Sequence, residues 1–212
     1  MADVDRKLIL ILGGARSGKS SFAEDLARRL AGDGEVLFVA TAEAEDEEMC
    51  QRIAEHRRRR PASWRTLEER LHLGKAVAEA VGGARVVLVD CVTLWMTNAL
   101  LAGVGPDEEA PPGVEAAALA EVDALLAAYR AGEATFVLVS NEVGLGLVPP
   151  YPLGRAYRDL LGRANQRLAA AADEVYLLVA GLPLELKALS RAFPGSALST
   201  EGATDTCQRT PV

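Results

Sequence analysis

The chain has 212 residues, half of them hydrophobic and a quarter charged, as in one globular domain with a substantial core. Its formal net charge of −7 argues against binding of nucleic acid through overall charge, and no apolar run is long enough to span a bilayer. Cys50, Cys91 and Cys207 are scattered and form no CxxC pair, which indicates a reducing cytoplasm rather than a disulfide framework or a zinc site.

The chain begins with a predicted strand, a glycine-rich turn and a predicted helix. The predicted strand is 7–12, in which residues 8–12 are apolar and partly β-branched, as in a buried strand, and residues 21–30 place apolar side chains at helical spacing. The Gly-Asp-Gly sequence at 32–34 ends that helix. Between strand and helix, the segment matches the phosphate-loop pattern G-x-x-x-x-G-K-[ST] at every fixed position. The phosphate loop consists of Gly13, Gly14, Ala15, Arg16, Ser17, Gly18, Lys19 and Ser20.

This loop predicts a nucleotide site. Backbone N–H groups of such a loop curl around an anion, and the following helix N-terminus adds a favourable dipole. Lys19 would reach the β- and γ-phosphates, and the Ser20 hydroxyl would take a ligand position on Mg²⁺. A chance glycine-rich turn is the alternative, but the complete pattern between a strand and a helix favours phosphate binding.

Strands and helices alternate along the rest of the chain. The further predicted strands are 36–40, 85–90, 135–140 and 175–179, with a short extended segment at 64–68. The further predicted helices are 43–60, a segment carrying Leu71, Val77 and Val81, then 93–101, 114–129 and 155–172. Residues 103–113 and 141–152 are rich in Gly and Pro and are predicted loops.

This alternation predicts an α/β fold with a mainly parallel sheet and helices on both faces, as in RecA-like P-loop NTPases. We expect residues 1–187 to form a single nucleotide-binding and transferase domain. Beyond Lys187 the composition turns to Ser, Gly and Thr, so residues 188–212 are expected to be a poorly fixed tail.

Asp90 ends the predicted strand 85–90, directly after the apolar residues 86–89, where a Walker-B acid would lie. It could bind Mg²⁺, directly or through water, or it could accept a hydrogen bond from the nucleotide. An ordinary polar residue at a strand end remains the alternative.

His56 precedes four consecutive arginines in an otherwise acidic protein. Met49, Ile53 and His56 share one face of the predicted helix. Nearby cations disfavour the imidazolium and keep a neutral nitrogen available, and they would stabilise charge on a reacting phosphoryl group. A structural histidine beside a solvated arginine run fits the same spacing, and spacing alone favours that interpretation.

Two longer motifs resemble the bifunctional adenosylcobinamide kinase / adenosylcobinamide-phosphate guanylyltransferase family of cobalamin biosynthesis. They are HRxxRPxxWRTxE, from His56 to Glu68, and NEVGxGxVP, from Asn141 to Pro149. The phosphate loop alone is generic, but its combination with these motifs is specific. The similarity covers roughly residues 7–187.

The resemblance implies phosphorylation of the aminopropanol hydroxyl of adenosylcobinamide with ATP or GTP. Transfer of GMP from GTP to that phosphate then gives adenosylcobinamide-GDP and pyrophosphate. The guanylyl group passes through a histidine, and His56 is the matching position, which reverses the interpretation from spacing. The family's assembly implies a homotrimer. The matching nucleotide positions are the phosphate loop, Ala40, Thr41, Ala42, Arg57, Arg58, Arg59, Arg60, Glu68 and Asp90.

The chain departs from some family members at two of these positions. Some members have two adjacent histidines where this chain has Glu55 and His56, and some have Glu where it has Asp90. Two other functions stay open on the residues alone. One is a small-molecule kinase with a structural His56, and the other is a RecA-like nucleotide switch that acts on a partner.

Several polar residues keep two interpretations each. Asn141 and Glu142 follow a strand on the side where ligands bind such sheets, and they could contact substrate or shape a turn. Arg155, Arg158 and Asn165 lie on the polar side of their helix and could face a ligand or only solvent.

Overall fold

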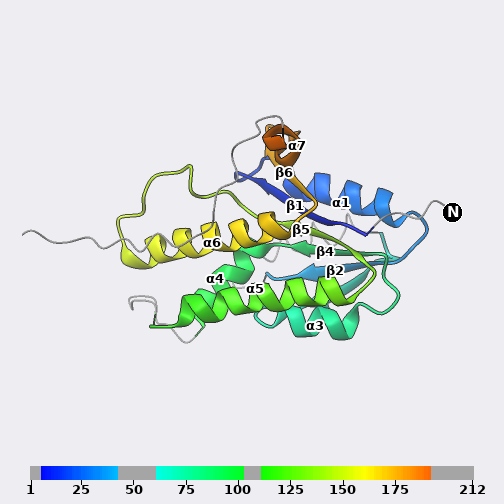
Figure 1. The fold of residues 1–212 in the computed structure, drawn as a ribbon, viewed down its shortest axis with the longest axis horizontal. Coiled ribbons are helices and arrows are strands. Elements are labelled where there is room, and N and C mark those ends of the chain that lie inside the picture. The colour runs from blue at the N-terminus through cyan, green and yellow to red at the C-terminus, as the bar shows by residue number, and fades with distance from the viewer. Residues whose placement is uncertain (1–5, 43–60, 103–110, 192–212) are drawn as a thin grey trace, which may run out of the picture.

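The computed structural model describes residues 6–42, 61–102 and 111–191. Within them, one sheet contains the strands β1 (Leu8–Gly13), β2 (Val36–Ala40), β3 (Arg65–Glu68), β4 (Val86–Asp90), β5 (Thr135–Val139), β6 (Glu174–Val179) and β7 (Leu182–Glu185). The seven strands lie in the order β3-β2-β4-β5-β1-β6-β7 (Figure 1). Each neighbouring pair is parallel except β6 and β7.

Helices cover both faces of this sheet. They are α1 (Lys19–Ala31), α3 (Leu73–Ala80), α4 (Val92–Leu101), α5 (Val114–Ala131), α6 (Pro152–Ala171) and α7 (Leu186–Arg191). Alternate side chains of β1 point to opposite faces: Leu8 and Leu10 pack with α3, α4, α5 and α6, whereas Ile9 and Ile11 pack with α1. In Figure 1, α1 lies above the central strands, and α3 and α5 lie below them. The predicted fold class, α/β with a mainly parallel sheet, is confirmed.

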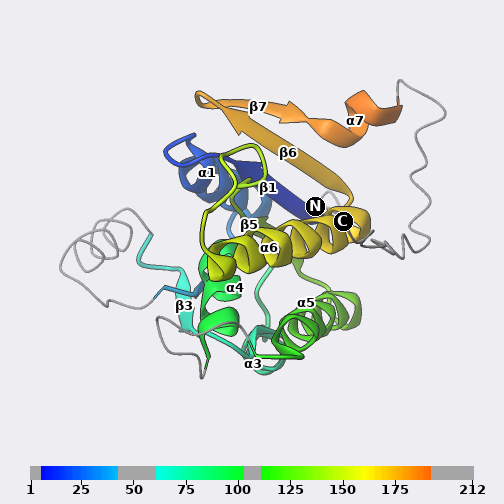
Figure 2. The ribbon, with the colours of Figure 1, turned by 90° about the vertical axis from the view of Figure 1, so that its left-hand side faces the viewer.

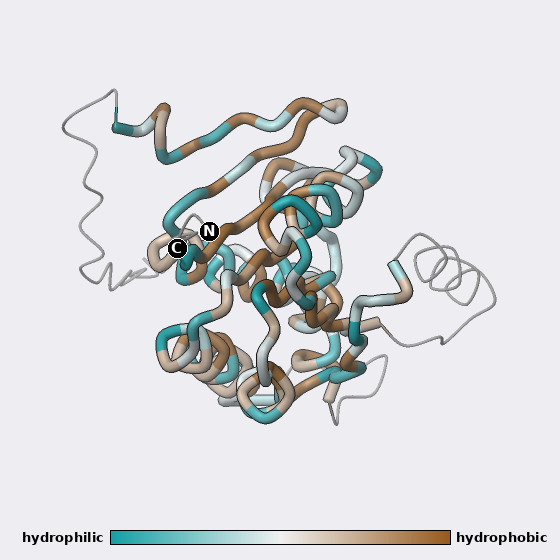
Figure 3. The backbone as a smooth tube through the Cα atoms, turned by 90° about the vertical axis from the view of Figure 1, so that its right-hand side faces the viewer, coloured by the Kyte–Doolittle hydropathy of each residue, from teal (hydrophilic) through white to brown (hydrophobic). Residues whose placement is uncertain are grey.

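The central strands are apolar along most of their length (Figure 3). All six residues of β1 are buried, as are all five of β5. Burial on both faces requires apolar side chains at successive positions, which explains why these strands were recognisable as continuous apolar runs.

The hairpin of β6 and β7 was not predicted. A two-residue turn, Ala180-Gly181, joins the two strands, and both residues have positive φ, 51° and 82°. Such values suit the type I′ turn that connects twisted antiparallel strands. Strand β7 could not be recognised from the sequence, because β7 has only four residues and contains Pro183, and a proline argues against a central strand.

Helices α6 and α3 begin at other residues than those predicted. Helix α6 begins at Pro152 because proline fits the first turn, where its missing N–H has no role. Helix α3 begins at Leu73, so Leu71 precedes it. The Glu69 carboxylate accepts the backbone N–H groups of Arg70, Leu71 and His72, which shapes the chain into a turn there.

Some predicted segments lie outside the described residues, namely the helix at 43–60, most of the loop at 103–113 and residues 192–212. Helix α7 runs on past Lys187 to Arg191. None of the helices in the described ranges is long and apolar enough to cross a membrane.

Candidate nucleotide site

The phosphate loop joins β1 to α1 at the carboxyl end of the central part of the sheet. Arg16 and Gly18 have φ of 56° and 94°, a conformation that turns the chain sharply before the helix. A Cβ on Gly13 would lie 2.6 Å from the Leu178 carbonyl oxygen and 2.7 Å from Ser17 Oγ. Position 13 must therefore be glycine, because both the backbone of β6 and the Ser17 side chain lie too close to leave room for a Cβ.

Two neighbouring turns hold the loop from either side. The Gly13 carbonyl accepts a hydrogen bond from the backbone N–H of Glu142, at 3.1 Å, in the segment between β5 and α6. The Ser17 carbonyl accepts one from the backbone N–H of Gly181, at 3.0 Å, in the turn between β6 and β7. The backbone of the loop is thus fixed by contacts to both flanking connections.

Lys19 is folded back over the loop. Its Nζ donates a hydrogen bond to the Gly14 carbonyl oxygen at 2.6 Å, and the residue is largely buried. Burial lowers the pKa of Lys19 below its ordinary value, while Cys91 and Asp90 act in the opposite direction and raise it. The lysine therefore lies within electrostatic reach of the end of β4.

Asp90 is the last residue of β4, as predicted, and pairs in register with Ala40 at the end of β2. One strand, β5, separates β4 from β1. The carboxyl ends of parallel strands meet at one edge of a sheet, so Asp90 and the phosphate loop share that edge.

Thr41 fastens the ends of β2 and β4 together. Its hydroxyl donates to the Cys91 carbonyl oxygen at 2.7 Å and accepts from the Cys91 N–H at 2.9 Å. Asn98 on α4 donates to the Thr41 carbonyl at 2.9 Å. The Thr41 side chain is fully buried, so the structure gives it a positioning role at this edge. Burial raises the pKa of the Cys91 thiol to about 12, which keeps it protonated at neutral pH.

A cavity of about 340 Å³ opens at the carboxyl ends of β2 and β3. It brings together three of the positions that the family resemblance singled out, Ala40, Ala42 and Glu68. The remaining lining residues are Glu69, Arg70, Leu71 and His72. His72 also lies 3.0 Å from a Glu121 carboxylate oxygen on α5, and this hydrogen bond raises the pKa of His72.

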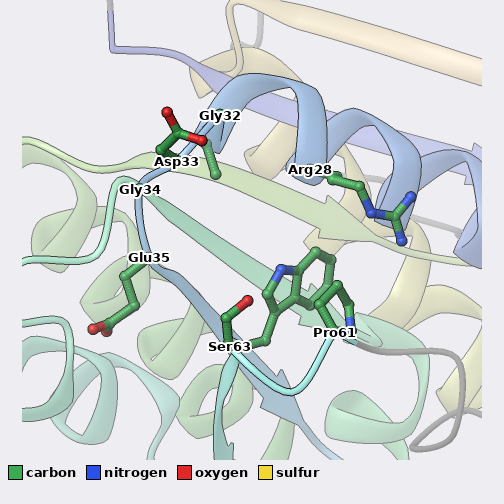
Figure 4. Close-up of a pocket in the computed structure, with 9 residues that line it drawn as sticks. Arg28, Gly32, Asp33, Gly34, Glu35, Pro61 and Ser63 are labelled. Carbon is green, nitrogen blue, oxygen red and sulfur yellow. The ribbon is translucent and has the colours of Figure 1, made fainter.

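A larger cavity, about 530 Å³, lies at the opposite end of the same strands (Figure 4). Its lining includes Arg28 on α1, Glu35 just before β2, and Pro61 and Ser63 before β3. Ligands of parallel α/β sheets bind outside the carboxyl ends of the strands, whereas this cavity is at the amino ends. The phosphate-loop edge, and not the larger cavity, therefore has the position expected of a nucleotide site.

Ser20 and Asp90 are the residues that could hold Mg²⁺. Within the described ranges, no group of three or more His, Cys, Asp or Glu side chains could hold a metal on its own. Magnesium is usually bound through one or two protein oxygens and completed by phosphates and water. A hydroxyl and a carboxylate at the phosphate-loop edge fit that mode of binding.

Buried polar contacts fix the start of the segment after β5. Ser140 Oγ donates to Asn165 Oδ1 at 2.7 Å, and Asn165 Nδ2 donates to the Asn141 carbonyl at 3.0 Å. The Glu142 carboxylate accepts the Gly144 N–H at 2.6 Å. Asn165 is thus a buried residue that holds Ser140 and Asn141 in place, and it does not face solvent. Glu142 shapes a turn.

The arginines of α6 also bind this segment. Arg158 donates to the Gly144 carbonyl at 2.9 Å, and Arg155 donates to the carbonyls of Pro149 and Pro150 at 3.2 and 2.7 Å. The polar side of α6 therefore braces residues 144–150 instead of facing only solvent.

Sequence reasoning missed two residues of α4 that position this edge. Thr93 Oγ1 accepts the Asn141 N–H at 2.8 Å, and Asn98 holds Thr41 as described above. Polar side chains within an otherwise apolar ten-residue helix were the available signal. His56 and the four arginines 57–60 lie outside the described residues, so their predicted roles stay predictions.

Comparison with known families gave a match that covers most of the chain. A family model described as cobinamide kinase / cobinamide phosphate guanyltransferase matches residues 9–186. The bifunctional adenosylcobalamin biosynthesis protein CobU of Escherichia coli (strain K12) is 45% identical over 183 residues, which cover 85% of this chain and 99% of that protein. The corresponding protein of Salmonella typhimurium is 44% identical over 184 residues, 85% and 99% of the two chains.

The bifunctional adenosylcobalamin biosynthesis protein CobP of Pseudomonas aeruginosa is 48% identical over 180 residues, 84% of this chain and 96% of that protein. Solved structures that match the chain include flagellar accessory protein FlaH from Methanocaldococcus jannaschii, with a TM-score of 0.45 and 15% identity, covering 81% of this chain and 70% of that one. Another solved structure, an ATPase domain, gives a TM-score of 0.46 at 14% identity, covering 81% and 69% of the two chains.

Proposed function

The chain belongs to the cobinamide kinase / cobinamide phosphate guanyltransferase family, and from that premise we propose that it carries out two successive phosphorus transfers in cobalamin biosynthesis. It phosphorylates adenosylcobinamide with ATP or GTP. It then transfers GMP from GTP to the new phosphate, by way of a guanylylated His56, to give adenosylcobinamide-GDP.

The observation that carries the kinase step is the phosphate loop with Lys19 folded over it and Asp90 on the same edge of the sheet. The loop N–H groups and the Lys19 ammonium would hold the β- and γ-phosphates and neutralise their charge. Ser20 and Asp90 would hold Mg²⁺, which supplies further neutralisation when bound. The aminopropanol oxygen forms a bond to the γ-phosphorus as the bond to the nucleoside diphosphate breaks, and the hydroxyl proton is released.

The guanylyl step would use a second chemistry. A neutral His56 nitrogen forms a bond to the α-phosphorus of GTP, and pyrophosphate leaves. The phosphate on the corrinoid then displaces His56, which forms the diphosphate bond of the product and frees the imidazole. Arg57 to Arg60 would stabilise the developing charge.

The described end of the same motif supports this assignment. Residues Arg65–Glu68 form β3, and Glu68 lines the cavity at the carboxyl ends of β2 and β3 with Ala40 and Ala42. These are three positions at which family members bind nucleotide, according to the resemblance. We also propose that the enzyme is a homotrimer. We place it in the cytoplasm, where ATP and GTP are both available.

The deciding experiment replaces His56 and follows both activities on one preparation. Wild-type protein incubated with [α-³²P]GTP should gain a protein-bound label that is acid-labile and alkali-stable, as expected of a nitrogen–phosphorus bond. His56→Asn should lose this label and the guanylyltransferase activity while keeping part of the kinase activity, because the phosphate loop can still position a triphosphate for in-line attack.

His72→Asn is the matched control, since His72 is the other histidine of the sequence and should not be needed for labelling. Label retained in His56→Asn and lost in His72→Asn would reassign the nucleophile. Wild-type protein that phosphorylates adenosylcobinamide but never gains label would be a single-activity kinase. Wild-type protein that hydrolyses nucleotide without using adenosylcobinamide would be a nucleotide switch.

A further inference from the structure

Two exposed apolar clusters flank the phosphate loop. The first lies in the connection between β5 and α6, where Leu145, Leu147, Val148 and Tyr151 are 86%, 96%, 64% and 60% exposed. The second lies at the turn between β6 and β7, where Val179 and Leu182 are 54% and 70% exposed. We call these six residues the apolar rim. Large apolar side chains grouped in exposed positions usually mark a binding surface.

The two segments that carry the rim are joined to the phosphate loop by backbone hydrogen bonds from residues near the rim. Glu142 N–H, three residues before Leu145, donates to Gly13, and Gly181 N–H, next to Leu182, donates to Ser17. In Figure 2, the connection that leads into α6 and the turn of the β6–β7 hairpin lie on the same side of the molecule as the start of α1. The rim therefore borders the place where the γ-phosphate would lie.

The first part of the rim is held in a defined conformation despite its exposure. Arg155 and Arg158 bind the carbonyls of this segment. The Tyr151 ring lies so close to Gly154 that a Cβ there would be 2.4 Å from a ring carbon. A surface that is ordered in advance loses less conformational entropy when it binds a ligand.

The chemistry of the rim does not match a nucleoside triphosphate, whose phosphates require N–H donors and cations. It matches an amphipathic macrocycle that has large apolar faces and carries an alcohol arm. In the proposed reaction, the alcohol of the corrinoid must reach the γ-phosphorus at the phosphate loop. The macrocycle must therefore lie no further from that loop than the length of the substituent that carries the alcohol. Apolar clusters on either side of the loop provide contact area at this distance.

We propose that the apolar rim is the docking surface for the corrin macrocycle of the acceptor, and this inference rests on the proposed function. The rim sets the affinity for the corrinoid in the kinase step, whereas the phosphate loop sets the affinity for the triphosphate. A second copy of the chain is the competing occupant, and the experiment below separates the two.

The test uses the full-length variant Leu145→Ser/Leu147→Ser. Both side chains are almost entirely exposed, so their replacement should leave the free energy of unfolding close to that of the wild type. The KM for adenosylcobinamide in the kinase reaction should rise about ten-fold or more. The dissociation constant for a non-hydrolysable GTP analogue, measured without corrinoid, should not change. Leu182→Ser changes the part of the rim on the other side of the phosphate loop, and it should also raise the KM for adenosylcobinamide.

Leu189→Ser is the matched control, because Leu189 is 53% exposed on α7 and lies beyond the far end of β7 from the rim. It should leave the KM for adenosylcobinamide unchanged. An unchanged KM in the rim variants, with the wild type fully active, would overturn the inference and leave the proposed function standing. A changed sedimentation coefficient in the rim variants would show that the rim joins copies of the chain, which also overturns it. Wild-type protein that neither binds nor phosphorylates adenosylcobinamide would overturn both.

Discussion

Lys19 lies where the proposed triphosphate would bind. Its ammonium group is largely buried and is held by the Gly14 carbonyl within its own loop. A triphosphate would replace that carbonyl with phosphate oxygens, which are stronger acceptors for a cation. Little movement of the side chain is then required, because the loop already places the charge at the phosphate site.

Replacement of this lysine should therefore affect catalysis far more than folding. Lys19→Ala removes the cation that would contact the β- and γ-phosphates, and loss of one such stabilising group costs on the order of 10²–10³ in rate. The kcat of both transfers should be compared with that of Lys75→Ala, which removes an exposed lysine on α3 that makes only a 4.0 Å ion pair with Glu79. Near-normal rates in Lys19→Ala would remove the phosphate loop from the mechanism.

At the scale of whole elements, the helices α3 and α5 pack against each other with very little space between their backbones. Gly74 of α3 faces the backbone of α5, and a Cβ at this position would lie 2.6 Å from the carbonyl carbon of Ala124 and 2.8 Å from the nitrogen of Leu125. Backbone atoms of a helix cannot rotate away as a flexible side chain can. The two helices approach each other this closely only because position 74 has no side chain.

Gly74→Ala should accordingly destabilise the protein by about 1–3 kcal/mol, the usual cost of overpacking a core. Gly162→Ala is the matched control, since Gly162 is also within a helix but has no atoms near its missing Cβ. That control should increase stability by about 0.5–1 kcal/mol, because alanine is the better helix former. Midpoints of urea unfolding measure both, and equal midpoints for the two variants would contradict the packing argument.

The predictable elements are those whose own residues determine their structure. Buried strands such as Leu8–Gly13 have apolar residues at every position, and the phosphate loop has fixed glycines, so both were recognisable from the sequence. The hairpin strand β7 has mixed residues and a proline, and its pairing with β6 depends on tertiary contact. The sequence could not show that Arg155 and Arg158 bind residues 144–150, for the same reason. Arginines on the polar face of a helix form the same sequence pattern whether or not a loop packs on them.

The candidate site divides in the same way. The position of Asp90 at the end of its strand followed from the apolar run before it. Its relation to Lys19 depends on the strand order, in which β5 lies between β4 and β1, the strand that leads into the phosphate loop, and no local pattern encodes that order. Thr41 was singled out by resemblance, yet its hydroxyl is engaged by Cys91, and only the fold could show this.

At the scale of the whole molecule, the family resemblance implies a homotrimer. Sedimentation equilibrium at micromolar concentration should then give a mass of three times the 22.4 kDa of one chain. Leu189→Ser should be measured beside the wild type, so that any change of mass caused by replacing one exposed leucine is detected. A stable monomer at that concentration would contradict the trimer and leave the assignment of the two transfers untouched.

Pro183 has a consequence for how copies of this protein can meet. Val179 and Leu182 close a two-residue turn and so exchange backbone hydrogen bonds, which leaves the next pair, Leu178 and Pro183, with backbone groups directed away from the partner strand. A residue at 183 would offer its N–H to the solvent, and proline has none to offer. The outer margin of β7 is therefore a poor template for a strand from another chain. The protein should resist fibril formation through this margin, and copies that meet at β7 must do so through side-chain surfaces instead of a sheet that continues across β7 from one copy into the next.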